Sequence, residues 1–237
     1  MALFSYHLVN VSLLTAWKVL LFPPKVGKTP GLIHMETMYA MTLGSPILSP
    51  SRFLFRQLVV FAQWESEADV EHYLNSTTLG QTLASGWHVR LRFLRQWGRI
   101  SGFQIPTENE TKYPDDAPVI AVTLARMRYF QVPRFIRWGR PTEQLVRDHP
   151  ATTLALASCH FPNLISTFSI WDSTTSMTDM VQGHSRVSQP KRHVNAMKER
   201  DRKDFHFEFT TLRFQPLAEF GTWNGKTNYS SNLTQTR

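Results

Sequence analysis

Cysteine is nearly missing from this chain of 237 residues, which holds a single one, Cys159. A lone cysteine cannot form a disulfide within the chain, and such a count is typical of the reducing interior of a cell. We therefore expect an intracellular protein, either cytoplasmic or peripheral to a membrane. Cys159 itself is predicted to be a buried structural residue, because its neighbour His160 would point to the opposite face of a strand.

A long uninterrupted apolar run is missing as well. The most apolar segment, residues 7–24, contains Lys18 and falls short of the ~20 apolar residues that a bilayer-spanning helix needs. It is not followed by a small-residue cleavage site of the kind that ends a signal peptide. We expect this segment to be part of the folded protein.

Several catalytic motifs are also lacking. The sequence has no glycine-rich phosphate loop, no zinc-spaced Cys/His cluster, no His-Glu-x-x-His and no Gly-x-Ser-x-Gly. Nucleotide-dependent transfer, zinc hydrolysis and serine hydrolysis therefore have no support in the sequence.

Acidic residues are few, 18 against 26 Lys and Arg, so the formal net charge is +8. The densest basic segment, residues 191–204, mixes acids among its bases and carries no interleaved aromatics until Phe205. That pattern favours a solvated helix face over a nucleic-acid surface, and we expect no nucleic-acid partner. Aromatic residues are plentiful, with 16 Phe and 7 Trp, which predicts an aromatic core or an aromatic-lined pocket.

Two similar phrases, FAQWES at residues 61–66 and FSIWDS at residues 168–173, mark an internal repeat. Around each phrase the apolar pattern predicts the order strand, helix, strand, strand, helix, strand. A serine stands two residues after each tryptophan, where its side chain can accept hydrogen bonds from the first turn of a helix. Trp64 and Trp171 are predicted to end a strand and to pack in the core.

That order of elements is the ferredoxin-like unit. The predicted fold class is α+β, with two tandem ferredoxin-like βαββαβ repeats packed sheet to sheet as an α/β barrel. Repeat 1 spans residues 1–100, a linker rich in Pro, Gly and acids spans 101–118, and repeat 2 with a C-terminal tail spans 119–237. We expect the two sheets to enclose a shared interior that holds a ligand.

The last strand of each repeat shows strict alternation, which is typical of a half-buried strand. The residues predicted to share a buried face are Val89, Leu91 and Phe93 in repeat 1 and Phe205, Phe207 and Phe209 in repeat 2. His88 and His206 alternate away from these faces and are expected toward solvent, with a pocket between the sheets as the alternative for one of them.

The second half resembles a known family. TLARMRYFQVPRFIRW at 123–138, TFSIW at 167–171, HVNAM at 193–197, EFTTL at 208–212 and GTWNG at 221–225 occur in the order seen in spheroidene monooxygenases and related proteins. KTPGLIHMETMYAMTLGS in the first half is similar to the corresponding segment of that family. The resemblance implies a duplicated, dimeric α/β-barrel type of fold and an oxygenase that acts on an acyclic carotenoid, with heme b as cofactor.

A heme needs an axial ligand in an apolar slot and cations for its propionates. The resemblance points to His193, in a His-x-x-Ala-apolar stretch, as the iron ligand on the second helix of repeat 2, with His184 as the runner-up. Arg134 and Arg137 are the predicted propionate partners, and Arg128 is the predicted polar catalytic group. The alternative is that His193 and these arginines are surface residues of basic helices.

Three functions remain open at this point. The first is a heme-dependent monooxygenase acting on an apolar, polyene-like or other lipophilic substrate, which would need an external electron donor. The second is a heme-dependent dehydratase of the aldoxime type on the same fold. The third is a non-catalytic module that binds a small hydrophobic ligand. A homodimer and peripheral contact with a membrane are compatible with each.

Overall fold

The computed structural model describes residues 3–46, 49–105 and 113–230. Part of the predicted linker, 106–112, and the end of the tail, 231–237, lie outside the described residues. The strands are β1 (Leu3–Asn10), β2 (Leu32–Met41), β3 (Phe53–Trp64), β4 (Trp87–Arg99), β5 (Val119–Met127), β6 (Thr152–His160), β7 (Leu164–Trp171) and β8 (His206–Phe220). The helices are α1 (Leu13–Leu21), α2 (Glu67–Ser76), α3 (Thr78–Ala84), α4 (Val132–Asp148), α5 (Thr174–Gln182) and α6 (Arg192–Arg202), with short 3₁₀ turns η1 (Pro50–Arg52) and η2 (Tyr129–Gln131).

The strands close into one antiparallel barrel in the order β1-β3-β2-β6-β7-β5-β8-β4. Each repeat contributes the ferredoxin-like order, β4-β1-β3-β2 from the first and β8-β5-β7-β6 from the second. The two sheets join edge to edge through β4 with β8 and through a short pairing of β2 with β6, from Tyr39↔Cys159 to Met41↔Ala157. The predicted duplicated α+β barrel is confirmed.

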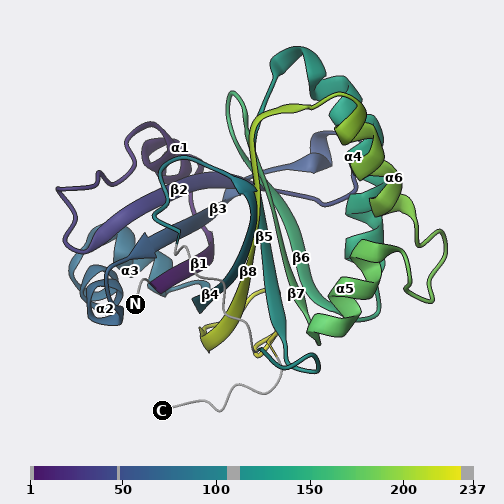
Figure 1. Cartoon of the computed structure of the whole chain (residues 1–237). Helices are drawn as coiled ribbons and strands as arrows, with labels where there is room; N and C mark the ends of the chain where they lie inside the picture. The colour runs from purple at the N-terminus through teal and green to yellow at the C-terminus, as the bar shows by residue number, and fades with distance from the viewer. Residues whose placement is uncertain (1–2, 47–48, 106–112, 231–237) are drawn as a thin grey trace.

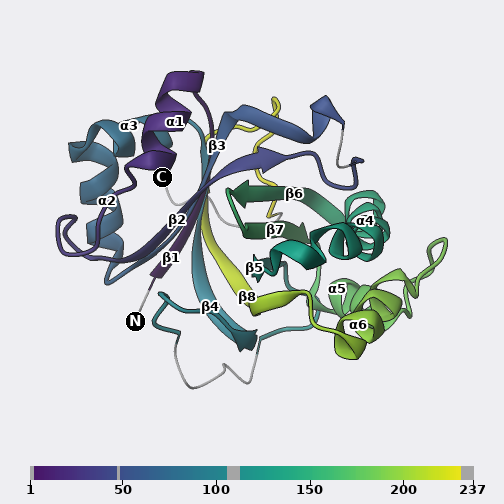
Figure 2. The ribbon, with the colours of Figure 1, turned by 90° about the horizontal axis from the view of Figure 1, so that it is seen from above.

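The helices lie outside the barrel, with α1, α2 and α3 on one side and α4, α5 and α6 on the other (Figures 1 and 2). Among the described helices, none combines the length and apolar character that crossing a bilayer requires. The layer of helices on each side matters for function, because each sheet has a face toward its helices as well as a face toward the barrel interior.

The barrel interior is packed with side chains from both repeats, in contrast to the expected ligand space between the sheets. Tyr6 stacks on Phe168 with ring centroids 3.9 Å apart, and Phe4 lies 5.0 Å from Phe214. These four side chains and Trp87 are fully buried. Aromatic rings are large enough to fill the space where two concave sheets face each other, so this interior is a core.

The repeated phrase has the same structural role in both halves. Trp64 and Trp171 end β3 and β7, and both indole rings are 1% exposed. The serine that follows caps the next helix in each copy: Ser66 accepts from the backbone N–H of Asp69 at 3.3 Å, and Ser173 from that of Ser176 at 3.1 Å. The prediction for both tryptophans and both caps is confirmed.

The alternation of the last strands is only half right. Val89, Leu91 and Phe93 are buried as predicted, but in repeat 2 Phe207 is exposed whereas Phe205 and its neighbour His206 are both buried. The reason is a bulge: Arg126 pairs with Glu208 and the next residue of β5, Met127, pairs with His206, so Phe207 has no partner in β5. One extra residue in a strand moves the following side chains to the other face.

His88 is also buried, against the expectation of solvent, because the helices of repeat 1 cover its face of the sheet. Its ring stacks on His7 at 5.1 Å, and next to it the fully buried Arg90 donates to Glu71 of α2 at 2.6 Å. Burial lowers the pKa of His88 to about 3 and that of His7 well below its ordinary value. These imidazoles are therefore neutral in the folded protein at pH 7.

We expect the free energy of unfolding to fall when the pH is lowered from about 6.5 toward 3. In that window the unfolded chain binds protons at His7 and His88 that the folded chain does not, which costs about 1.4 kcal/mol per pH unit and histidine. Urea unfolding at several pH values measures the slope, and His88→Asn should flatten it. The exposed His72 provides the control, since His72→Asn should leave the slope unchanged; equal slopes in the wild type and His88→Asn would contradict the prediction.

Candidate functional site

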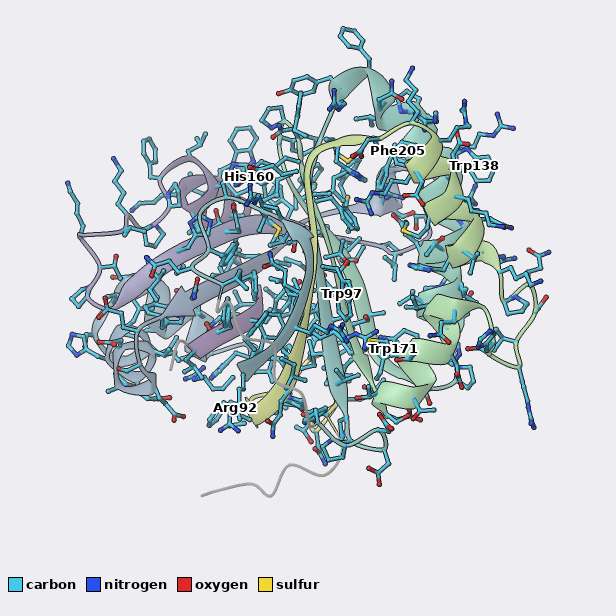
Figure 3. All side chains as sticks on the ribbon, viewed as in Figure 1. Arg92, Trp97, Trp138, His160, Trp171 and Phe205 are labelled. Atoms are coloured by element: carbon cyan, nitrogen blue, oxygen red, sulfur yellow. The ribbon has the colours of Figure 1, made fainter. Side chains whose placement is uncertain are left out.

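A cavity of about 570 Å³ lies between the sheet of repeat 2 and its three helices, α4, α5 and α6. Trp97, Trp138, Trp171 and Phe205 surround this space in Figure 3. Small side chains of β5, β7 and β8 form part of its floor: Ala121, Thr123, Thr167, Ser169 and Thr211. The candidate site is therefore outside the barrel, under the helices, and not between the two sheets as expected.

The repeats differ at this position because of side-chain size. Leu3 pairs with Trp64 and Val119 with Trp171, so Thr123 and Thr211 occupy the places that His7 and His88 fill in repeat 1. In repeat 1, α2 packs directly on the sheet, with Tyr73 5.1 Å from the ring of Trp64. Threonine is smaller than histidine, so this pair of side chains fills less of the space between the sheet and the helices in repeat 2. The cavity lies in this space.

Repeat 1 helps to hold α4 over the cavity. The buried carboxylate of Glu143 on α4 pairs with Nη2 of Arg52 at 3.2 Å and accepts from the N–H of Gly44 at 2.9 Å. Arg147 of the same helix donates to the carbonyl of Leu43 at 3.0 Å. Leu43 and Glu143 also line the cavity, so the long β2–β3 hairpin of repeat 1 closes one end of a site built on repeat 2.

The insertion after α5 supplies another wall. Gly183, with φ of 77°, ends α5, and α6 begins nine residues later as a separate helix rather than a continuation. One face of α6, at spacings of three and four residues, presents its side chains to the cavity. These are His193, Ala196, Met197 and Arg200.

A hydrogen bond fixes the orientation and the tautomer of the His193 imidazole. Its Nδ1 lies 3.0 Å from the carbonyl oxygen of Val181, so Nδ1 carries the hydrogen and donates it. Burial lowers the pKa of His193, which keeps the ring neutral. The lone pair then lies on Nε2, the arrangement of a histidine that ligates a metal through Nε2.

His206 lies in the cavity lining at the start of β8. Its ring is 3% exposed, Nδ1 lies 3.1 Å from Oδ1 of Asp204, and Nε2 is buried with no hydrogen-bond partner among the described residues. Burial lowers the pKa of His206 to about 4, despite the opposing charge of Asp204. Phe205, Phe135 and Phe209 enclose the ring at 4.9–5.7 Å. An unsatisfied buried nitrogen of this kind is costly, and it marks a position that a bound ligand can satisfy.

Three arginines line the same cavity. Arg95 and Arg213 both lie over the ring of Trp97, at 4.9 and 4.5 Å, and Arg200 lies over Phe209 at 4.1 Å. Burial and the nearby charge of Arg95 lower the pKa of Arg213 to about 10. Within the described part of the chain none of the three forms an ion pair, so they are available to an anionic group of a ligand.

The sequence prediction placed one residue in this cavity, His193. His184 is exposed on the loop before α6 and does not contact the cavity. Arg134 donates to Glu199 at 2.8 Å, Arg128 donates to the carbonyl of His206 at 2.9 Å, and Arg137 is exposed; all three lie outside the lining. Their predicted roles in catalysis and cofactor binding stay predictions.

Of the arginines in the cavity lining, which the sequence did not predict, Arg213 can be recognised from the internal repeat. Arg213 stands at the same register position as Arg90, since Ala121 pairs with Arg213 and Ser5 with Arg90. Aligning the repeats residue by residue would have drawn attention to it. Arg95 comes from β4 of the other repeat, and only the closure of the barrel brings it to this site.

No family model matches the chain. Spheroidene monooxygenase from Rubrivivax gelatinosus is 27% identical over 210 residues, which cover 84% of this chain and 77% of that protein. The chain is therefore similar to a spheroidene monooxygenase over most of its length.

A solved structure extends the comparison to the fold. The crystal structure of an aldoxime dehydratase in complex with butyraldoxime matches it with a TM-score of 0.61 at 9% identity, covering 96% of this chain and 85% of that one. At this identity the likeness shows a common fold and leaves the reaction to the residues of the site.

Proposed function

We propose that the cavity under α4, α5 and α6 binds heme and that the protein is a heme-dependent monooxygenase acting on a lipophilic substrate. The observation that carries this proposal is His193, a neutral imidazole fixed through Nδ1 in the lining of a largely apolar cavity. Its Nε2 has no hydrogen-bond partner among the described residues. The name of its relative, spheroidene monooxygenase, supports oxygenation and a polyene substrate.

The residues of the cavity fit a heme. Nε2 of His193 would hold the iron, and the carbonyl of Val181 orients the imidazole through Nδ1. Arg95, Arg200 and Arg213 would hold the propionates, because guanidinium groups bind carboxylates in a bidentate manner. When bound, the heme would supply the redox-active iron that activates dioxygen.

His206 also lines the cavity, and we propose that it acts on the substrate. Its Nε2 has a free lone pair and can take a proton or accept a hydrogen bond, while Asp204 holds Nδ1. The surrounding phenylalanines exclude water from this nitrogen, which strengthens each polar contact that it makes. We assign to His206 the transfer of protons during oxygenation.

The proposed monooxygenase reaction requires an electron donor. Insertion of one oxygen atom from dioxygen into a C–H bond yields a hydroxyl group and water, and it consumes two electrons and two protons. Because the sequence lacks a nicotinamide-binding motif, we propose that an external electron-transfer protein or small reductant delivers these electrons. The substrate needs no charge, since apolar and aromatic side chains dominate the remaining lining.

One observation favours a second candidate, dehydration of an aldoxime. The fold matches that of an aldoxime dehydratase, and the free Nε2 of His206 could donate a proton, once protonated, to a leaving hydroxyl group. This reaction consumes neither dioxygen nor external electrons. Turnover without oxygen and without a reductant would therefore favour dehydration, and a strict requirement for both would favour the monooxygenase.

Reconstitution with hemin tests the proposal. The full-length protein should give a Soret band with a stoichiometry of one heme per chain, and should convert an acyclic polyene only with dioxygen and a reductant. His206→Gln should keep the band but lose turnover by about 10²–10⁴-fold, the usual effect of removing an acid–base group. A colourless protein that binds lipophiles unchanged would overturn the proposal in favour of a binding module.

A further inference from the structure

Helix α1 presents large apolar side chains to solvent. Ala16, Val19 and Leu20 pack on the sheet, but Leu14 is 81% exposed and Trp17 57% exposed, and Leu13, Leu21 and Phe22 are also exposed. A helix on a soluble protein ordinarily carries polar residues on its outer face. Here both faces are apolar, which calls for a second apolar contact.

The apolar surface continues beyond the helix. Leu13 borders a surface groove together with residues 53–57 of β3. Phe53 stacks on the exposed Phe55 at 5.6 Å and lies 5.7 Å from Phe161, which is also exposed at the β6–β7 turn. We call this continuous surface of α1, residues 53–57 and Phe161 the apolar edge; Figure 1 shows α1 and the turn after β6 at the top.

Three exposed cations flank the apolar edge. Lys18 on α1, Lys25 just after it and Arg56 on β3 are exposed. Residues 1–64 contain a single acidic residue, Glu36, and its carboxylate is paired with Arg126 at 3.0 Å. A partner for this surface therefore has an apolar layer beneath a layer of negative charge.

We propose that the apolar edge docks on the surface of an anionic lipid bilayer. An amphipathic helix binds there by inserting its apolar side chains at the boundary between headgroups and acyl chains, while lysine and arginine meet the headgroups. Tryptophan is the residue that prefers this boundary, and Trp17 stands in the middle of the exposed face of α1. A second copy of the chain is disfavoured as the occupant, because its own apolar edge carries the same positive charges.

Flotation of the full-length protein with phosphatidylcholine vesicles, with or without phosphatidylglycerol, tests this assignment. The wild type should float with the phosphatidylglycerol vesicles and should bind less at high salt, because salt screens the headgroup contacts. The double variant Leu14→Ser/Trp17→Ser should lose at least about tenfold in partitioning, since two large apolar side chains no longer enter the bilayer. Both residues are exposed, so circular dichroism should show an unchanged fold.

A matched control is Phe220→Ser, which removes a partly exposed aromatic ring at the end of β8, remote from the apolar edge (Figure 1). Its vesicle binding should equal that of the wild type. Equal binding of the double variant, or a wild type that stays in the buffer, would overturn the proposal. Light scattering could instead show a wild-type dimer and a monomeric double variant, with no vesicle binding by either. That result would assign the surface to a second copy of the chain. These readouts do not depend on heme.

Discussion

Replacing His193 by alanine is expected to abolish the Soret band of the hemin-reconstituted protein. Nε2 of His193 is the nitrogen left free by the bond from Nδ1 to Val181, and α6 offers no second imidazole to the cavity. Loss of even an outer-shell partner of a metal ligand costs 10–100-fold in affinity, so loss of the ligand itself should cost more than about 100-fold. Spectroscopic titration with hemin measures this change.

The control for this prediction is His184→Ala. His184 lies nine residues before His193 on the same insertion, is exposed and does not line the cavity, so the variant should bind hemin like the wild type. An unchanged band in His193→Ala, together with a lost band in the His206 variant, would transfer the ligand role to His206. Loss of the band in His184→Ala would contradict the position of the site.

The second large effect concerns stability. Trp64→Ala should lower the free energy of unfolding by about 3–5 kcal/mol, the usual cost of truncating a buried tryptophan. Its indole packs between the sheet and Tyr73 of α2, and its Nε1 donates to Ser5 at 2.9 Å. That loss is a large part of the stability of an ordinary domain, and urea unfolding monitored by circular dichroism measures it.

Trp171 provides the matched comparison, because it stands at the same place in repeat 2 and is equally buried. One side of its ring faces the cavity, so Trp171→Ala removes fewer packing contacts and should destabilise the protein less. The same variant should weaken hemin binding, since it alters a wall of the site. Equal destabilisation by both substitutions would mean that the cavity collapses around Trp171 in solution.

The two repeats differ in the space between the sheet and its helices: side chains fill it in repeat 1, and a cavity occupies it in repeat 2. In repeat 1 the face under the helices is filled by Trp64, Tyr73 and the stacked pair His7 and His88. In repeat 2 Thr123 and Thr211 stand at the places of His7 and His88, and α6 is separated from α5 by an insertion. The first copy also contributes Arg95 and the β2–β3 hairpin, so the site belongs to repeat 2 but depends on both.

Period-two alternation, serine caps and the repeated Trp-acid-Ser phrase are local properties of the chain, so they predicted the strands and the helix that begins after each phrase. They did not predict the additional helices α3 and α6, and His193 lies on α6 and not on the second helix of repeat 2. The sequence also singled out His193, through a short segment that resembles a family. What it could not determine was which face of each sheet would be filled. That outcome depends on the size of side chains that meet from distant strands, as Tyr6 meets Phe168.

The remaining features depend on contacts between distant parts of the chain. A bulge of one residue in β8 buried His206 and exposed Phe207, and an alternating pattern gives no sign of such a shift. Closure of the barrel brought Arg95 from repeat 1 beside Arg213 over one indole ring. Burial and charge depend on neighbours in space, whereas a sequence records neighbours along the chain. His193 could therefore be singled out in advance as a candidate, whereas its surroundings could not.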